Sequence, residues 1–309
     1  MTIRIAIVGF GKIARDQHAP TIARSPDFDL VAVATRHDQP QDLPAFDSIE
    51  ALLASDVAFD AVALCQPPQV RFSAALAALR AGKHVFLEKP PGATLSEVEL
   101  LADEARTRGL SLFASWHSRY ASGVAAAKRW LAAHPPTSVE IVWKEDVRHW
   151  HPGQQWIWQP GGLGVFDPGI NALSIATEIL PEPFFLQAGA LSFPANREAP
   201  IAADLAFATA SGTAVRAIFD WRQTGPQTWD IRAETAAGAL VLSRGGSSLA
   251  IAGEAQPTAD EAEYAGLYAR FAELIRTRAS DVDVAPMRHV ADAFLRADRM
   301  AVEPFEDQG

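Results

Sequence analysis

The chain has 309 residues, of which 49% are hydrophobic, a length and composition that fit about two globular domains. Its 27 basic and 37 acidic side chains give a net charge of −10, which argues against DNA or RNA as the main partner because phosphate backbones select basic surfaces. The single cysteine, Cys65, excludes an internal disulfide and a cysteine-based zinc site.

The negative charge is concentrated in the second part of the chain. Residues 1–120 carry 12 basic and 14 acidic side chains, a net charge of −2, whereas residues 121–309 carry 15 and 23, a net charge of −8. If this second part holds a substrate, a neutral molecule is easier to accept than an anion. No apolar run approaches the roughly 18 residues of a membrane span, and the first residues lack the pattern of a secretory signal. A cytoplasmic protein is therefore expected.

Short apolar runs alternate with helical stretches over the first 118 residues. The runs typical of strands buried on both faces are 3–8, 29–34, 60–65, 84–87 and 110–114. Between them lie two predicted helices, 69–81 and 94–108, the second opening with the capping box of Thr94 and Glu97 and closing at Gly109. Strands that alternate with helices predict a parallel, doubly wound sheet.

From about residue 137 the pattern changes to successive short strands. Residues 137–146 alternate, which places Val139, Ile141, Trp143 and Glu145 on one face. Further strands are expected at 186–193, 205–210, 214–221, 227–234 and 239–243, and helices at 263–277 and 286–299. The fold class is therefore α/β: an N-terminal Rossmann domain, residues 1–120, and a C-terminal α+β domain, residues 121–309, with a large, mostly antiparallel open sheet. The first domain is expected to bind a dinucleotide, and the second to bind substrate and form the oligomer.

Residues 9–14 read Gly-Phe-Gly-Lys-Ile-Ala, a G-x-G-x-x-A loop between a predicted strand and a predicted helix. Gly9 permits the tight turn, Gly11 lets the backbone approach a pyrophosphate, and Ala14 lets helix and strand pack closely. Free N–H groups at the helix N-terminus then bind the phosphates. The candidate coenzyme-binding residues in this loop are Gly9, Gly11, Lys12, Ile13 and Ala14. A glycine turn without a ligand is the alternative.

The residues after the second strand select between the two nicotinamide coenzymes. NAD usually calls for Asp or Glu there, but this chain has Thr35, Arg36 and His37. A hydroxyl followed by a guanidinium suits the 2′-phosphate of NADP, so NADP is predicted as the cofactor and the use of NAD is left open. A solvated surface arginine is the alternative for Arg36. The residues that follow the strand at 60–65 are expected to shape the coenzyme wall: Gln66, Pro67 and Pro68.

Charged residues follow two other predicted strands. Ligands of open α/β sheets bind beyond the carboxyl ends of the strands, where Glu88-Lys89-Pro90 follows 84–87. The chain has five lysines against 22 arginines, which favours a role for Lys89 as a compact charge that arginine cannot replace. A structural Glu–Lys pair is the alternative. His117 and Arg119 follow the strand at 110–114 and are expected either to bind substrate or to anchor the domains.

Two segments of the second half combine polar and aromatic residues. Asp167 precedes Pro168, which favours a helix N-cap, while the spacing of Asp167 and Asn171 also places both on one helix face. Residues 143–158 hold four tryptophans interleaved with polar residues, which is typical of a sugar-binding surface or of a core. His149 and His151 have no third ligand at a set spacing, so no metal is expected.

The G-x-G-x-x-A loop, Glu88-Lys89-Pro90 and the glycine-rich stretch ending in Asp167 together resemble the glucose–fructose oxidoreductase/inositol dehydrogenase (Gfo/Idh/MocA) family over essentially the whole chain. Residues 11–18, 116–119 and 143–171 look most like the bacterial NAD(P)-dependent L-arabinose/D-galactose 1-dehydrogenases of that family. This resemblance implies oxidation of an aldopyranose at C1 to the aldonolactone. The family motif usually ends in a histidine where this chain has Asn171, which can orient a hydroxyl but cannot accept a proton at neutral pH.

The resemblance also implies roles for individual residues. Asp167, assisted by Asn171, is the first candidate for the base that takes the C1 hydroxyl proton, and Lys89 would bind the same oxygen. Lys89 as a neutral base is the second assignment. The expected sugar contacts are His117, Arg119, Glu145, Trp150 and Trp229, and Glu88 and Lys89 are expected to border the coenzyme as well.

The expected substrate is a small neutral monosaccharide, and the expected assembly is a homodimer. Two other functional classes remain open on the same fold, because a fold alone does not determine function. One is a non-catalytic sugar or NADP sensor. The other is a lyase, epimerase or glycosidase that uses tightly held NAD for transient oxidation.

Overall fold

The computed structural model describes residues 2–36, 39–260 and 262–306. The chain divides into two compact units, one formed by residues 1–117 and 263–284 and the other by residues 118–262 and 285–309. Within the described residues, no helix combines the length and apolar character that crossing a membrane requires.

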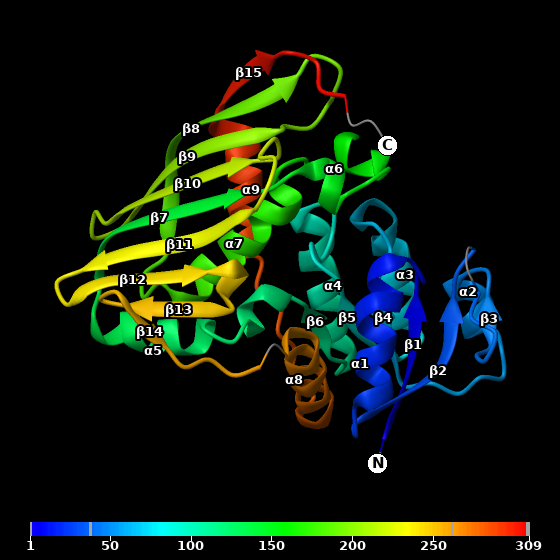
Figure 1. Ribbon diagram of the computed structural model, residues 1–309. Helices are drawn as coiled ribbons and strands as arrows, with labels where there is room; N and C mark the ends of the chain where they lie inside the picture. Colours follow the sequence, from blue (N-terminus) through cyan, green and yellow to red (C-terminus); the bar gives the residue numbers. More distant parts are fainter. Residues whose placement is uncertain (1, 37–38, 261, 307–309) are drawn as a thin grey trace. The chain divides into compact units, whose positions relative to one another are not determined.

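The first unit is built on a parallel sheet that has six strands within the described residues (Figure 1), in the order β3-β2-β1-β4-β5-β6. The strands are β1 (Ile3–Val8), β2 (Phe28–Ala34), β3 (Ala45–Phe46), β4 (Ala61–Leu64), β5 (His84–Leu87) and β6 (Leu112–Ala114). Every residue of the central strand β4 is fully buried, as expected for a strand covered on both faces. The predicted Rossmann sheet is confirmed.

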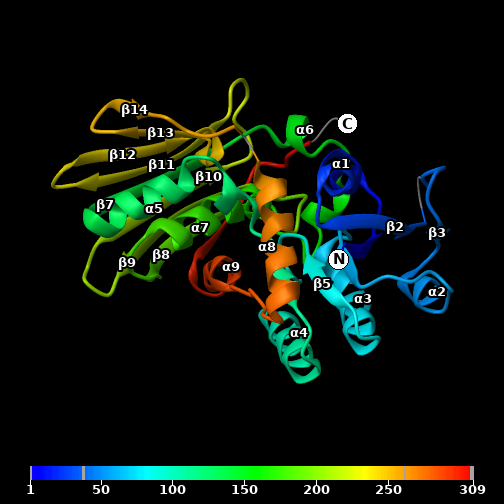
Figure 2. The same cartoon turned by 90° about the horizontal axis from the view of Figure 1, so that it is seen from below.

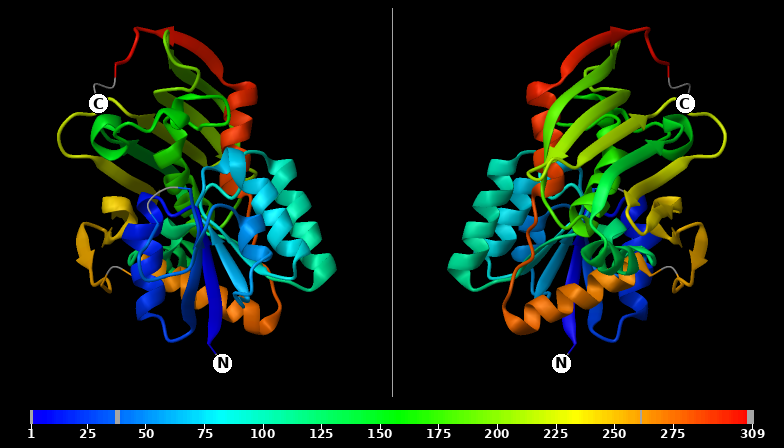
Figure 3. Two further views of the ribbon diagram at one scale, coloured as in Figure 1. Left: turned by 90° about the vertical axis from the view of Figure 1, so that its right-hand side faces the viewer. Right: turned by 90° about the vertical axis from the view of Figure 1, so that its left-hand side faces the viewer.

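Helices cover both faces of this sheet (Figure 3). They are α1 (Ala19–Arg24), α2 (Ile49–Leu53), α3 (Pro68–Arg80), α4 (Leu95–Arg108) and α8 (Glu263–Thr277), and a π-helical turn (Ala14–His18) precedes α1. Thr94 and Glu97 form the predicted capping box at the start of α4. Gly109 ends that helix with a φ of 64°, the left-handed conformation that favours glycine.

Helix α8 joins the first unit from far along the chain. Phe271 stacks on Phe28 with ring centroids 5.8 Å apart, and Tyr268 stacks on Phe86 with centroids 5.2 Å apart. Such aromatic pairs contribute about 0.5–1.5 kcal/mol each beyond the area they bury. These contacts tie residues 263–284 to the first sheet, so the compact units differ from the chain-order division expected at residue 120.

The second unit is built on a mixed sheet of nine strands in the part of the chain that the structure describes, in the order β14-β13-β12-β11-β7-β10-β9-β8-β15. The strands are β7 (Pro136–Lys144), β8 (Phe184–Pro194), β9 (Ala202–Thr209), β10 (Ala214–Asp220), β11 (Thr228–Thr235), β12 (Gly238–Ser243), β13 (Ser248–Ile251), β14 (Glu254–Gln256) and β15 (Asp298–Val302). Neighbouring strands are antiparallel except in the pairs β7–β10 and β8–β15, which confirms the expected mostly antiparallel sheet.

A layer of helices lies against one face of this sheet (Figure 2). It consists of α5 (Val124–Ala133), α7 (Phe166–Ile179) and α9 (Ala285–Arg296), and a short helix, α6 (Val147–Trp150), follows β7. The residues Val139, Ile141 and Trp143, predicted to share one face of β7, are each at most 4% exposed, so this face is the buried one. The alternation predicted for this strand is confirmed.

Two local predictions are wrong. The helix expected over 286–299 ends at Arg296, and residues 298–302 form β15 because they pair in parallel with β8. Asp167 is not an N-cap, since α7 begins at Phe166 with Val165 in the capping position. The cause is the preceding turn, in which the Phe166 amide already donates to the Leu163 carbonyl. The helix therefore begins before Pro168, the residue expected to open it.

Candidate active site

The glycine loop has the geometry that a dinucleotide requires. Gly9 has a φ of 86°, and a Cβ there would lie 2.8 Å from the Gln66 side chain, so only glycine fits. At Gly11 no described atom lies within 4 Å of the position a Cβ would take, which leaves the backbone open to a ligand. Ala14 is fully buried, as close packing of helix on strand requires.

A hollow of about 590 Å³ opens beside this loop. Its lining includes Gly9, Gly11, Thr35, Arg36, Gln66 and Pro67. The buried Oε1 of Gln66 has no hydrogen-bond partner among the described residues, and an unsatisfied buried acceptor points to a missing donor. The volume, the open glycine backbone and this acceptor fit a bound dinucleotide.

The other expected coenzyme residues lie around the loop. Thr35 is buried and its amide donates to the Phe46 carbonyl at 2.7 Å, while Arg36 is exposed beside the hollow. Lys12 is exposed and pairs with Asp16. The remaining two are Ile13, which is 38% exposed, and Pro68, which is buried at the start of α3. His37 lies outside the described residues.

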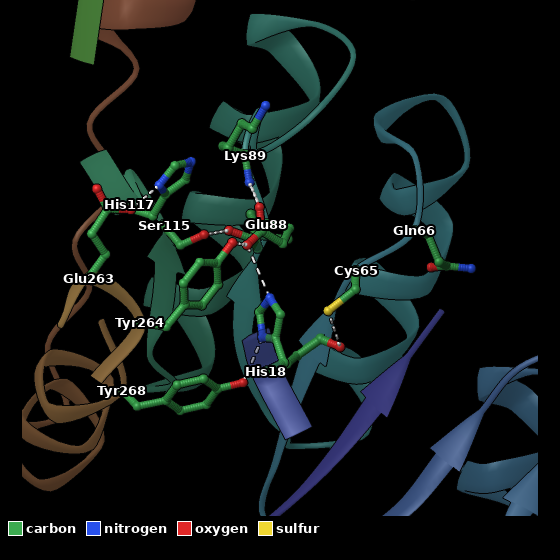
Figure 4. A network of polar contacts seen from close by, with 12 residues as sticks. His18, Cys65, Gln66, Glu88, Lys89, Ser115, His117, Glu263, Tyr264 and Tyr268 are labelled. Atoms are coloured by element: carbon green, nitrogen blue, oxygen red, sulfur yellow. Dashed lines mark hydrogen bonds and ion pairs between the residues drawn. The ribbon is translucent and has the colours of Figure 1, made fainter. Parts of the chain in front are cut away.

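The turn after β5 carries Lys89 and is held by the buried carboxylate of Glu88. Glu88 Oε2 accepts the Lys89 amide at 2.7 Å, and Oε1 accepts the hydroxyl of Tyr264 at 2.8 Å (Figure 4). His18 Nε2 lies 3.0 Å from the same Oε1, and its Nδ1 lies 2.7 Å from the hydroxyl of Tyr268. Lys89 itself is half-buried, and the Lys89–Pro90 peptide bond is cis. His18, Tyr264 and Tyr268 are absent from the predicted site because these contacts join distant segments.

Arg71 of α3 holds the same turn from its carbonyl side. Its guanidinium donates to the backbone carbonyls of Gln66, Glu88 and Pro90, which joins the turns after β4 and β5. Burial lowers the pKa of Arg71 to about 10, so the group remains charged at neutral pH. In the sequence Arg71 is one arginine among many in an alanine-rich helix, and no local pattern marks it.

His18 and Glu88 form a buried ion pair. Burial opposes ionisation of Glu88, but hydrogen bonding and charge from His18 outweigh it and lower the Glu88 pKa to about 2. Burial alone would lower the pKa of His18, yet Cys65, Tyr268 and Glu88 raise it well above its ordinary value. Both groups are therefore charged at neutral pH, and each compensates the buried charge of the other.

His117 and Arg119, two residues apart, make different contacts. His117 Nδ1 lies 2.6 Å from a carboxylate oxygen of Glu263, and its ring stacks on Tyr264. Arg119 donates to the Ser174 carbonyl and to the Thr177 hydroxyl of α7, each at 3.0 Å. These Arg119 contacts lie within the second unit. Anchoring of the domains and sugar binding, by either side chain, stay predictions.

In the second unit, two buried carboxylates flank the ring of His151. His151 Nε2 lies 3.5 Å from Glu145 Oε1 and 3.6 Å from Asp167 Oδ2. Glu145 follows β7, His151 follows α6, and Asp167 lies in the first turn of α7, with half-buried Asn171 one turn further on. From sequence His151 is considered as a metal ligand and as part of the polar, tryptophan-rich segment, and its place between two carboxylates is not predicted. No group of three His, Cys, Asp or Glu side chains that could hold a metal occurs among the described residues.

Glu145 also organises the tryptophans of this unit. Its two oxygens accept the indole N–H groups of Trp221 at 3.2 Å and Trp229 at 2.8 Å. Trp150, 39% exposed, lies against Trp229 with ring centroids 5.0 Å apart. The tryptophan-rich segment contributes partly to the core and partly to the surface. Trp143 and Trp158 are core residues, whereas Trp150 and Trp156 are not buried.

The fold and these groups define a class of protein. A Rossmann unit with an open glycine loop and a lysine at a strand end belongs to the dinucleotide-dependent oxidoreductases. The second unit offers carboxylates, an imidazole, an amide and an exposed indole, which suit a neutral ligand rich in hydroxyl groups.

Comparison with known proteins defines the family. The sequence profile described as "Oxidoreductase family, NAD-binding Rossmann fold" (GFO_IDH_MocA) matches residues 3–115. A galactose 1-dehydrogenase of Pseudomonas fluorescens is 48% identical over 305 residues, covering 99% of each chain. The crystal structure of a D-galactose-1-dehydrogenase from Rhizobium etli is 60% identical with a TM-score of 0.95, covering 99% of this chain and 98% of that one.

A 3-ketoreductase from Actinomadura kijaniata, solved with NADP and TDP-benzene, has a TM-score of 0.85 at 20% identity over 98% of this chain and all of its own, which shows the shared fold alone. The chain belongs to the GFO_IDH_MocA family of oxidoreductases, and the resemblance read from the sequence motifs is confirmed.

Proposed function

We propose that this chain oxidises the C1 hydroxyl of galactose-type aldopyranoses to the aldonolactone, with NADP as the hydride acceptor. The observation that carries the proposal is its similarity, over nearly the whole chain, to two proteins named galactose 1-dehydrogenase. The polar and aromatic groups gathered around Glu145 and Asp167 support it, because their chemistry suits a sugar.

The proposed chemistry assigns separate tasks to three side chains. A bound nicotinamide coenzyme supplies the acceptor for the hydride that leaves C1. Asp167 takes the proton of the C1 hydroxyl, and Asn171 orients that hydroxyl. Lys89 contacts the same oxygen and stabilises its developing negative charge. The proposal includes the convergence of side chains 89 and 167 on one oxygen; Lys89 as a neutral base is the second assignment.

The sugar ring would be held by His117, Arg119, Glu145, Trp150 and Trp229. Each carboxylate oxygen of Glu145 has more than one lone pair, so it can accept a sugar hydroxyl besides an indole N–H. Exposed Trp150 offers a flat apolar face to the C–H groups of a pyranose. L-Arabinose, D-galactose and D-fucose share their configuration at C2–C4, and all three are expected substrates.

The preference for NADP follows from the residues at the end of β2. Thr35 and Arg36 border the coenzyme hollow where NAD-specific proteins usually carry a carboxylate. A guanidinium favours the 2′-phosphate through a charge-assisted hydrogen bond, and the use of NAD stays open. A cytoplasmic homodimer is expected as well, and light scattering on the purified protein tests the oligomeric state.

An absorbance assay of coenzyme reduction with a panel of free aldoses tests the proposal. We expect net formation of NADPH with D-galactose, L-arabinose and D-fucose, and far slower reduction with aldoses of other C4 configuration. Sugar binding without reduction would instead identify a sensor. Product formation without net NADPH would identify a lyase, epimerase or glycosidase that oxidises its substrate only transiently.

A further inference from the structure

Glu88 is a buried carboxylate, 4% exposed, that takes no direct part in the proposed chemistry. Its two oxygens have different partners: Oε2 accepts the backbone amide of Lys89, while Oε1 faces the hydroxyl of Tyr264 and Nε2 of His18 (Figure 4). Tyr264 lies 176 residues from Glu88 and His18 lies 70 residues away, so three distant segments meet at this carboxylate. The carboxylate is therefore held in one orientation by donors on both of its oxygens.

The backbone of Lys89 is fixed from both sides by buried side chains. Glu88 holds the amide of Lys89, and Arg71 holds the carbonyls of Glu88 and Pro90. The Lys89 side chain extends away from Glu88 in Figure 4, so Glu88 acts on the backbone of Lys89 and not on its ammonium group. Fixing the backbone limits the space that the flexible lysine side chain can reach.

We propose that Glu88 is a positioning residue for Lys89, and that Tyr264 and His18 serve the reaction by orienting the Glu88 carboxylate. This inference rests on the proposed function, in which Lys89 contacts the reacting oxygen. Displacement of a reacting group by about 1 Å can lower a rate by roughly 10²-fold, so the orientation of this carboxylate matters to turnover without any contact to substrate.

Helix α8 offers a matched pair of variants. Tyr264→Phe and Tyr268→Phe each remove one buried hydroxyl from residues that are 7% and 1% exposed. Only the Tyr264 hydroxyl contacts Glu88, since the Tyr268 hydroxyl contacts Nδ1 of His18. Glu88→Gln is a second, independent variant, because its amide group places a donor against either the Lys89 amide or the two donors at Oε1.

Two readouts separate positioning from folding. The first is kcat and KM for D-galactose together with the Kd of the coenzyme. The second is the rate at which acetic anhydride acylates Lys89, followed by peptide mass spectrometry with Lys128 as the internal reference. Lys128 lies in the second unit, on α5, and its ammonium pairs with Glu178.

For Tyr264→Phe and Glu88→Gln we expect kcat to fall about 10-fold or more, the effect of losing one hydrogen bond to a charged group. KM and the coenzyme Kd should stay within about 2-fold, the sign of a group that acts only in the transition state. The acylation rate of Lys89 should change at least about 3-fold relative to Lys128. Tyr268→Phe acts on Glu88 only through His18, so it should lower kcat and change the acylation rate of Lys89 clearly less than Tyr264→Phe does.

Equal losses of kcat in the two tyrosine variants would overturn the inference, because they would reflect general destabilisation. A rise in KM alone, or unchanged acylation of Lys89 in both Tyr264→Phe and Glu88→Gln, would overturn it as well. If none of the tested aldoses leads the wild-type protein to reduce its coenzyme, the proposed function fails. The acylation measurement still decides in that case whether Glu88 positions Lys89.

Discussion

The buried pair of His18 and Glu88 predicts a specific response of stability to acid. The pKa of Glu88 is about 2 in the folded protein and has an ordinary value of 4.5, so the ionised form stabilises the fold. This contribution is fully present above pH 4.5 and disappears as the pH falls toward 2. Glu88→Gln has no carboxyl group to protonate and should lose stability less steeply over the same interval.

The size of the effect follows from the difference between the two pKa values. A difference of about 2.5 pKa units corresponds to roughly 3 kcal/mol of unfolding free energy. For a unit of this size, 1 kcal/mol shifts the Tm by about 2–4 °C, so the wild-type protein should lose roughly 6–12 °C more than Glu88→Gln on acidification.

The stability that His18 contributes depends on pH with the opposite sign. The pKa of His18 is raised in the folded protein above its ordinary value of 6.5. Its contribution to stability is therefore present below about pH 6.5 and is lost as the pH rises through the raised pKa. The ion pair therefore stabilises the first unit most strongly between these two limits.

Differential scanning calorimetry at a series of pH values between about 5 and 2 measures this difference. Glu99→Gln, on the exposed face of α4 in the same unit, is the matched control and should follow the wild-type curve. Parallel Tm curves for the wild type and Glu88→Gln would refute the reasoning, since they would show that Glu88 titrates alike in the folded and unfolded states.

Three further predictions concern the active site. Lys89→Ala and Asp167→Ala should each lower kcat by roughly 10²-fold or more in steady-state assays, and near-normal turnover in Asp167→Ala would remove it from the chemistry. Arg36→Ala should lower kcat/KM for NADP about 10-fold relative to NAD, whereas strict NAD preference of the wild type would contradict the assigned role. Glu145→Gln leaves one indole N–H facing an amide donor. It should therefore lower the free energy of unfolding by about 1–3 kcal/mol, measured by thermal unfolding, and raise the KM for galactose. Glu140→Gln, exposed on β7, is its control and should have almost no effect on either quantity.

Features encoded in short stretches of sequence were predictable. Strand β1 and helix α8 have the predicted bounds, and the capping box at Thr94 forms as expected. The glycine loop was predictable because the demands for a positive φ at Gly9 and for a small residue at position 14 are local. Periodicity and capping depend on neighbours a few residues apart, and the sequence displays those directly.

Features that depend on distant contacts were not predictable. The residues that hold the Lys89 turn, namely Arg71, His18 and Tyr264, come from three elements whose sequences show only ordinary helical patterns. Strand β15 exists because β8 offers a free edge, a property of the folded sheet. In the same way, His151 gains its place between Glu145 and Asp167 only when β7, α6 and α7 are assembled.

A crystal structure with D-galactose and NADPH, a pair that cannot react, tests the central claim most directly. We expect Lys89 Nζ and a carboxylate oxygen of Asp167 both to lie within about 3.2 Å of the sugar O1, with C1 facing the nicotinamide ring. A sugar whose O1 is contacted by neither side chain, or by only one of them, would contradict the proposed convergence on a single oxygen.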